Sequence, residues 1–230
     1  MRLAPVPTDP ADLTYFGLRR AVGIIALGLP FALAIPWYLC WQAAESSISG
    51  YYHTGMRNLF VGSLCGIALF MICCRGYDDW DTFADIFSGI CALGVAFFPT
   101  TSDGVASQFQ QTIGKIHWTC AALLFLTLAC FCLFLFTMSA QGRTLTPKKI
   151  LRNRVYRICG GVILLSMAMI AILKLRDIKY LYAGLGSDFL FETTALLAFG
   201  FAWLVKGRTL LTDDESAPPA QARPPGTPIS

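Results

Sequence analysis

The chain has 230 residues, of which 55% are hydrophobic and only 14% are charged. Soluble domains carry about 25% charged residues, so this composition excludes an ordinary soluble globular protein and indicates a single membrane domain. The net charge of +4 gives no reason to expect a nucleic-acid partner, because the basic residues lie at the edges of apolar runs, where they set membrane topology.

Six apolar segments follow one another, and apolar runs long enough to cross about 30 Å of hydrocarbon as an α-helix recur among them. The third segment, residues 82–98, is short. The predicted helices cover residues 16–41, 55–74, 82–98, 113–138, 155–175 and 187–205. We therefore expect an all-α fold, a polytopic bundle of six transmembrane helices over residues 16–209. Residues 1–15 form a predicted N-terminal tail without the basic head and apolar core of a signal peptide. Residues 210–230, rich in Pro, Ala, Ser and Thr, form a predicted disordered C-terminal tail.

The connections between these segments differ in character. The first, residues 47–58, is dense in polar side chains and is where chemistry is most easily placed. In the second helix, Gly62 and Gly66 form a small-xxx-small pattern that predicts a close helix contact. The acidic run over residues 76–81 predicts a solvated turn with aspartates at the N-terminus of the third helix, and a cation site is the alternative. The cysteines lie mostly in apolar runs, so we expect them to pack as small hydrophobes.

Basic residues are distributed unevenly between the two sides of the predicted bundle. Six spans place both termini on one side, and that side then carries thirteen lysines and arginines against five on the other. Six of the thirteen lie in the single segment 141–157. The positive-inside rule predicts that both termini are cytoplasmic, and the same cations suit anionic lipid headgroups. Membrane lipids are therefore the expected partners.

Ionisable residues gather at the predicted outer end of the bundle. Both histidines of the chain, His53 and His117, are placed there. Asp188 and Glu192 are placed there too, and their i,i+4 spacing puts them on one helix face. Ionisable groups near the bilayer edge usually face a cavity and pair with one another, so these are candidate functional groups. The first connection contributes three further candidates to the polar set: Ser47, Ser49 and Arg57.

Three interpretations of this polar set are open: a structural network, a site for a small ligand or a lipid headgroup, and a catalytic metal site. Imidazole and carboxylate groups suit zinc, and a zinc-bound water would serve as the nucleophile of a hydrolase acting on a lipid amide or ester. The predicted zinc ligands are His53, His117, Asp188 and Glu192. A small-solute transporter is a further alternative, although the chain shows no internal repeat.

The first connection and the helices after it resemble an uncharacterised family of bacterial six-helix integral membrane proteins with a SISxYYHT motif. The resemblance covers roughly residues 47–100 and rests on Ser47-Ile48-Ser49-Gly50-Tyr51-Tyr52-His53-Thr54, Arg57, Phe60-Val61-Gly62, Arg75-Gly76-Tyr77-Asp78 and Ala92-Leu93-Gly94-Val95-Ala96-Phe97-Phe98-Pro99-Thr100. It implies a multi-pass protein of the bacterial cytoplasmic (inner) membrane and adds no activity.

A fainter similarity is to the superfamily of alkaline ceramidases and adiponectin-type receptors, which are seven-helix membrane hydrolases with a zinc site. Ser47 or Ser49 and His53 look like the first elements of that site. Asp188 and Glu192 stand where the superfamily has two histidines in its last helix. This similarity implies a zinc-dependent hydrolase.

Overall fold

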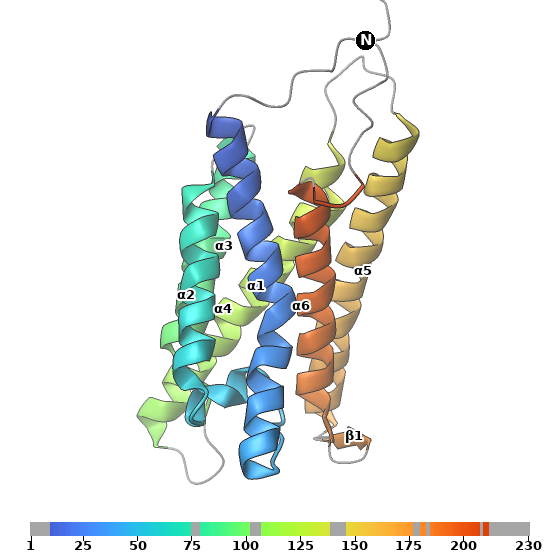
Figure 1. Ribbon diagram of the computed structural model, residues 1–230. Coiled ribbons are helices and arrows are strands. Elements are labelled where there is room, and N and C mark those ends of the chain that lie inside the picture. The colour runs from blue at the N-terminus through green and yellow to red at the C-terminus, as the bar shows by residue number, and fades with distance from the viewer. Residues whose placement is uncertain are drawn as a thin grey trace, which may run out of the picture.

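The structure is a computed structural model that describes residues 10–74, 79–101, 107–138, 146–176, 180–182, 185–207 and 209–211. In chain order its elements are α1 (Pro10–Trp41), η1 (Ser49–His53), α2 (Arg57–Cys73), α3 (Asp79–Phe97), α4 (Gln108–Leu133), η2 (Leu135–Thr137), α5 (Pro147–Leu175), β1 (Tyr180–Tyr182), β2 (Leu185–Gly186) and α6 (Ser187–Lys206). The η elements are short 3-10 helices, and β1 pairs antiparallel with β2. Figure 1 shows the described α-helices side by side, as expected for an all-helical bundle.

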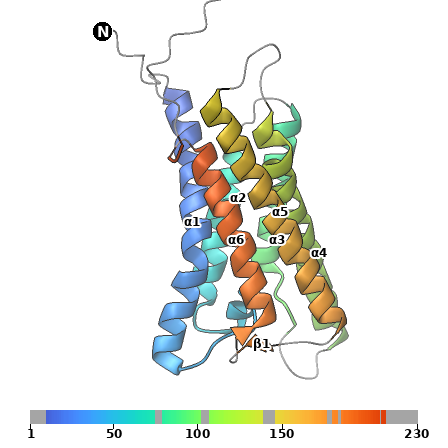
Figure 2. The same cartoon turned by 90° about the vertical axis from the view of Figure 1, so that its right-hand side faces the viewer.

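Consecutive helices are neighbours in space. Each α-helix packs against the next one in the chain, and α6 returns to pack against α1, which closes the six described helices into a ring. Figure 2 shows α1, α6 and α5 next to one another along one side of this ring. Because the helices alternate in direction, η1 and the β1–β2 hairpin lie at one end and the start of α1 lies at the other (Figure 1).

Apolar side chains face outward from the ring as well as inward. Large apolar residues that are more than half exposed include Ile24, Leu39, Leu69 and Leu165. Among the described helices, α1 and α3 to α6 are long and apolar enough to cross a membrane, while α2 is apolar but has 17 residues. An apolar outer surface of this kind is stable against lipid and unstable against water. The chain therefore has the build of a helical membrane protein.

Four helices begin earlier than predicted, and α3 does so by three residues, at Asp79 instead of residue 82. Hydropathy locates the apolar part of a helix, and capping residues mark where α4 and α5 start. α4 begins at Gln108 instead of residue 113, after a capping box between Ser107 and Gln110. α5 begins at Pro147 instead of residue 155, with Thr146 as its N-cap. α1 begins six residues early, at position 10 instead of 16. Of the predicted C-terminal tail, only residues 210 and 211 are described.

The helices approach one another most closely at glycines other than the predicted pair. A Cβ at Gly62 would meet no atom of the described residues within 4 Å, and one at Gly66 would meet Ile25 Cδ1 only at 3.7 Å. The predicted small-xxx-small contact is therefore wrong. Close approach occurs instead between α1 and α6, where a Cβ at Gly23 would lie 3.0 Å from the carbonyl oxygen of Gly200. A Cβ at Gly200 would lie 2.9 Å from the carbonyl oxygen of Gly23, so both positions need glycine.

Candidate functional site

Glu192, in the second turn of α6, holds the segment that precedes η1. Its Oε2 accepts hydrogen bonds from the backbone N–H groups of Ile48 (2.6 Å) and Ser49 (3.4 Å), and its Oε1 accepts one from Ser49 Oγ (3.4 Å). The contact is reciprocal, because the N–H of Phe189 donates to the carbonyl oxygen of Ser46 at 2.8 Å. A carboxylate at the start of a helical turn satisfies N–H groups that have no partner within the turn. Glu192 therefore fixes η1 against α6.

Ser47 supports the same turn from within the first connection. Its Oγ accepts a hydrogen bond from the N–H of Gly50 at 2.9 Å and lies 3.2 Å from Ser49 Oγ. Tyr51, within η1, is 1% exposed, and burial raises the pKa of its phenol. The segment in which chemistry was expected is thus folded into a short 3-10 turn, and two of its five residues are buried in the bundle.

Both histidines bind one short segment, the chain that follows α3. His53 Nε2 donates to the carbonyl oxygen of Thr100 at 2.8 Å, and His117 Nδ1 donates to that of Phe98 at 2.6 Å. A carbonyl oxygen only accepts, so each of these ring nitrogens carries its proton. His117 is 2% exposed, whereas His53 is exposed. The two imidazoles therefore position this connector.

Glu192 and His117 also line one cavity inside the ring. Its volume is about 50 Å³, and its polar lining residues are Ser49, His117 and Glu192. The other lining side chains are apolar, such as Leu29 of α1 and Phe60 of α2. One or two water-sized molecules fit this volume, whereas drug-sized ligands need pockets of roughly 300 Å³ or more. Three of the predicted site residues, from η1, α4 and α6, thus share one interior cavity.

Arg57 and Asp188 lie at the same end of the ring but have other partners. Arg57 Nη2 donates to the Tyr52 hydroxyl, and its guanidinium carbon lies 4.3 Å from the centre of that ring. Asp188 Oδ2 forms an ion pair of 3.0 Å with Lys174 Nζ. The same Nζ lies 3.5 Å from the ring centre of Trp118. The predicted set is therefore divided among several local contacts.

The four predicted zinc ligands are not grouped together. Within the described ranges, no three His, Cys, Asp or Glu side chains lie in an arrangement that could hold a metal ion. His53 and His117 donate to two different carbonyl groups, and Asp188 pairs with a lysine. Zinc binding by these histidines with Asp188 and Glu192 stays a prediction, and it requires these side chains to leave their present partners.

A second polar cluster, which the sequence did not single out, lies at the opposite end of the ring. Arg19 Nη2 of α1 and Asp85 Oδ2 of α3 form an ion pair of 3.2 Å, and both side chains are 0% exposed. The guanidinium carbon of Arg19 lies 5.4 Å from the ring centres of Phe136 and Trp203. Arg19 is one of the basic residues that lie at the edge of an apolar run in the sequence. In the structure it lies in the third turn of α1, and its side chain is buried.

The acidic start of α3 contributes to this cluster. Asp79 is exposed, as a solvated turn requires, whereas Asp81 is only 6% exposed. The expected solvated turn is therefore wrong for Asp81. Residues 75–78 lie outside the described residues. Asp85 Oδ1 and Ser88 Oγ are buried and make no hydrogen bond within the described part of the chain. A signal was available, since Asp81, Asp85 and Ser88 fall on one face of an apolar helix. Ionisable residues inside apolar runs are expected to face a bundle interior.

No protein-family model, curated protein or solved structure matches this chain. Its resemblance to the bacterial six-helix family, and its fainter similarity to ceramidases and adiponectin-type receptors, therefore stay predictions. The function has to be inferred from the chain's own geometry: the contact of η1 with α6, the cavity at Glu192 and His117, and the buried pair of Arg19 and Asp85.

Proposed function

We propose that this protein is a six-span protein of the bacterial inner membrane, with both termini in the cytoplasm and a binding cavity for one water-sized ligand at its outer end. The orientation is supported by the thirteen cations that fall on the side of the termini. The binding function rests on one observation: His117 and Glu192, from separate helices, line the same interior cavity.

The chemistry of the cavity favours a small hydrogen-bond donor. The lining contains the carboxyl group of Glu192, the imidazole of His117 and the hydroxyl of Ser49, and its other side chains are apolar. A buried carboxylate is stabilised by each further donor or cation that reaches it. The volume of about 50 Å³ admits a water molecule or a cation of similar size, such as ammonium, and leaves no room for a lipid headgroup.

Ammonium chloride is a suitable probe of this site. The melting temperature of the purified protein is measured in ammonium chloride and in tetramethylammonium chloride at equal ionic strength. A ligand that binds only the folded state stabilises it by RT ln(1 + [L]/Kd), so we expect ammonium to raise the melting temperature more than the larger cation does. Equal shifts in the two salts contradict the proposal.

Two alanines on α4 give a matched pair of variants for the same measurement. Ala121 lines the cavity, so Ala121→Val fills it without removing a hydrogen bond of Glu192. Ala122 is exposed on the outer face of α4, so Ala122→Val adds the same side chain away from the cavity. We expect the ammonium effect to disappear in Ala121→Val and to persist in Ala122→Val. An effect that survives in both variants places ammonium elsewhere and refutes the site.

Glu192→Gln tests the role of the charge. Glutamine keeps the shape of the side chain, but it is neutral and accepts hydrogen bonds through only one oxygen. The buried N–H groups of Ile48 and Ser49 therefore lose their charged acceptor. We expect a loss of about 1.5–3 kcal/mol in the free energy of unfolding and no remaining preference for ammonium. A variant that is as stable as the wild type contradicts the role given to Glu192.

Metal analysis separates this proposal from the zinc hydrolase. The protein is purified without added metal, and bound zinc is measured for the wild type, His53→Ala and His117→Ala. Stoichiometric zinc that is lost in both variants would replace the ammonium site by a metal site.

Orientation is tested with one cysteine at Lys148 in a cysteine-free chain. Labelling of this cysteine by an impermeant reagent from outside the cell contradicts cytoplasmic termini.

A further inference from the structure

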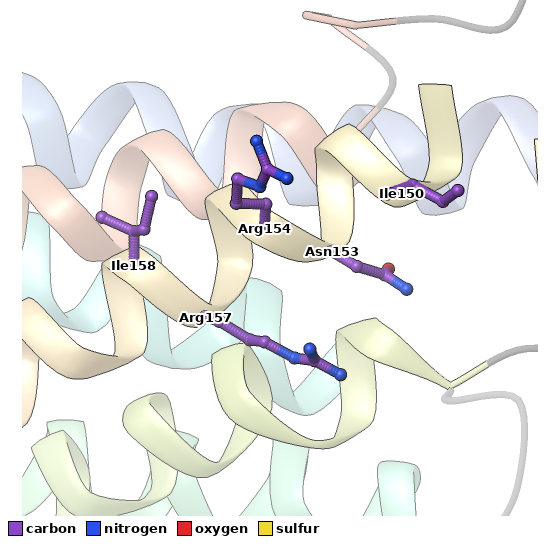
Figure 3. A pocket seen from close by; sticks show the side chains of 5 residues that line it. All are labelled: Ile150, Asn153, Arg154, Arg157 and Ile158. Carbon is purple, nitrogen blue, oxygen red and sulfur yellow. The ribbon is translucent and has the colours of Figure 1, made fainter. Parts of the chain in front are cut away.

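A shallow groove lies on the first turns of α5, at the end of the ring opposite to the cavity. It has a volume of about 430 Å³ and is lined by Ile150, Asn153, Arg154, Arg157 and Ile158. These residues form two adjacent rows at i,i+4 spacing on one face of the helix. Figure 3 shows the two arginine side chains leaving α5 on different sides, with Arg157 extending toward the N-terminal end of the helix. Arg154 stands between the two isoleucines in one row and Arg157 follows Asn153 in the other, so the groove combines two arginines with two apolar side chains.

The length of α5 places these arginines at the membrane surface. The helix has 29 residues, so it is about 44 Å long and exceeds the roughly 30 Å thickness of the hydrocarbon. The run from Ile158 to Leu173 holds no charged residue and spans about 24 Å by itself. When that run crosses the hydrocarbon, Arg154 and Arg157 lie at the level of the lipid phosphates. Ile158, which is 59% exposed, lies where the acyl chains begin.

The neighbouring cations of this helix are used inside the protein, whereas the groove arginines face outward. Lys149 Nζ donates to the carbonyl oxygen of Phe136 at 3.1 Å, and Arg152 Nη1 donates to that of Leu211 at 3.1 Å. Arg154 and Arg157 are exposed and make no hydrogen bond or ion pair among the residues that the structure describes. No acidic residue occurs in α5, so nothing along this helix neutralises them.

We propose that this groove binds the headgroup of an anionic phospholipid, with the phosphate held by Arg154 and Arg157 and an acyl chain lying along Ile158. Guanidinium groups suit phosphate because their planar N–H donors match its oxygens. The two isoleucines beside the arginines favour a lipid over a free phosphate ion. This site is independent of the cavity at Glu192, so either proposal can fail without the other.

Lipid retention in detergent tests the groove. The purified protein is incubated with equimolar phosphatidylglycerol and phosphatidylcholine, and the bound lipids are counted by native mass spectrometry. Each arginine near an anionic headgroup contributes roughly a factor of five, so we expect a preference of roughly 25-fold for phosphatidylglycerol. The double variant Arg154→Gln/Arg157→Gln should lose that preference, and each single variant should lose about a factor of five of it.

Arg176→Gln is the matched control, because Arg176 is an exposed arginine at the opposite end of α5. It should retain the wild-type preference. Equal retention of the two lipids by the wild type, an unchanged preference in both single variants, or an equal loss in Arg176→Gln overturns the proposal. If the double variant fails to fold, the two single variants decide the outcome in the same way.

Discussion

Arg19 and Asp85 offer a direct measure of what a buried charge contributes to this bundle. Their ion pair of 3.2 Å joins two side chains that are 0% exposed. In Asp85→Leu the guanidinium stays in the interior without this carboxylate, and breaking a buried pair in this way costs about 3–5 kcal/mol. The rings of Phe136 and Trp203 contact the guanidinium already in the wild type, so they do not offset the loss.

The double variant Arg19→Met/Asp85→Leu should recover most of that stability. It replaces both charges by apolar side chains of similar volume, and the bundle no longer has to desolvate either ion. We expect its free energy of unfolding to lie within about 1 kcal/mol of the wild type, or above it. The coupling energy between the two substitutions should therefore be about 3 kcal/mol or more.

The assay is unfolding by titration with SDS in mixed lipid micelles, followed by circular dichroism, for the wild type, both single variants and the double variant. Asp79→Leu is the control, because Asp79 is an exposed aspartate in the first turn of the same helix. It should have a much smaller effect than Asp85→Leu. The reasoning is refuted if Asp85→Leu costs less than about 1 kcal/mol, or if the two single effects add up to the effect of the double variant.

Two further predictions concern the end of the ring at which η1 lies. A Cβ at Gly186 would overlap the backbone of Ser46, so Gly186→Ala should lower the free energy of unfolding by about 1–3 kcal/mol. A Cβ at Gly62 meets open space, so Gly62→Ala should leave the free energy of unfolding unchanged in the same SDS titration. Lys174→Met breaks the ion pair between Lys174 and Asp188, whose side chains are 43% and 18% exposed. Because solvent screens this pair, we expect the free energy of unfolding to fall by no more than about 1 kcal/mol. A loss as large as that of Asp85→Leu contradicts this expectation.

Helix capping explains most of the difference between the predicted and the observed helix boundaries. Hydropathy located the apolar core of every helix, but Ser107 and Thr146 start α4 and α5 in polar sequence that hydropathy does not detect. The burial of Arg19 has another cause, because its side chain lies between helices and pairs with Asp85 of α3. Local signals of this kind were present in the sequence but were weaker than the apolar pattern.

The sequence by itself determined that the chain is a helical membrane protein and that its two histidines, Asp188 and Glu192 gather at one end. Both conclusions follow from the order of apolar and polar segments, since alternating helices bring every second connection to the same end. Only the tertiary structure decided the partner of each group. His117 shares a cavity with Glu192, whereas Asp188, one turn from Glu192, pairs with Lys174. The physical reason is that a side chain's partner depends on the rotation and depth of neighbouring helices, which the packing of the whole ring fixes.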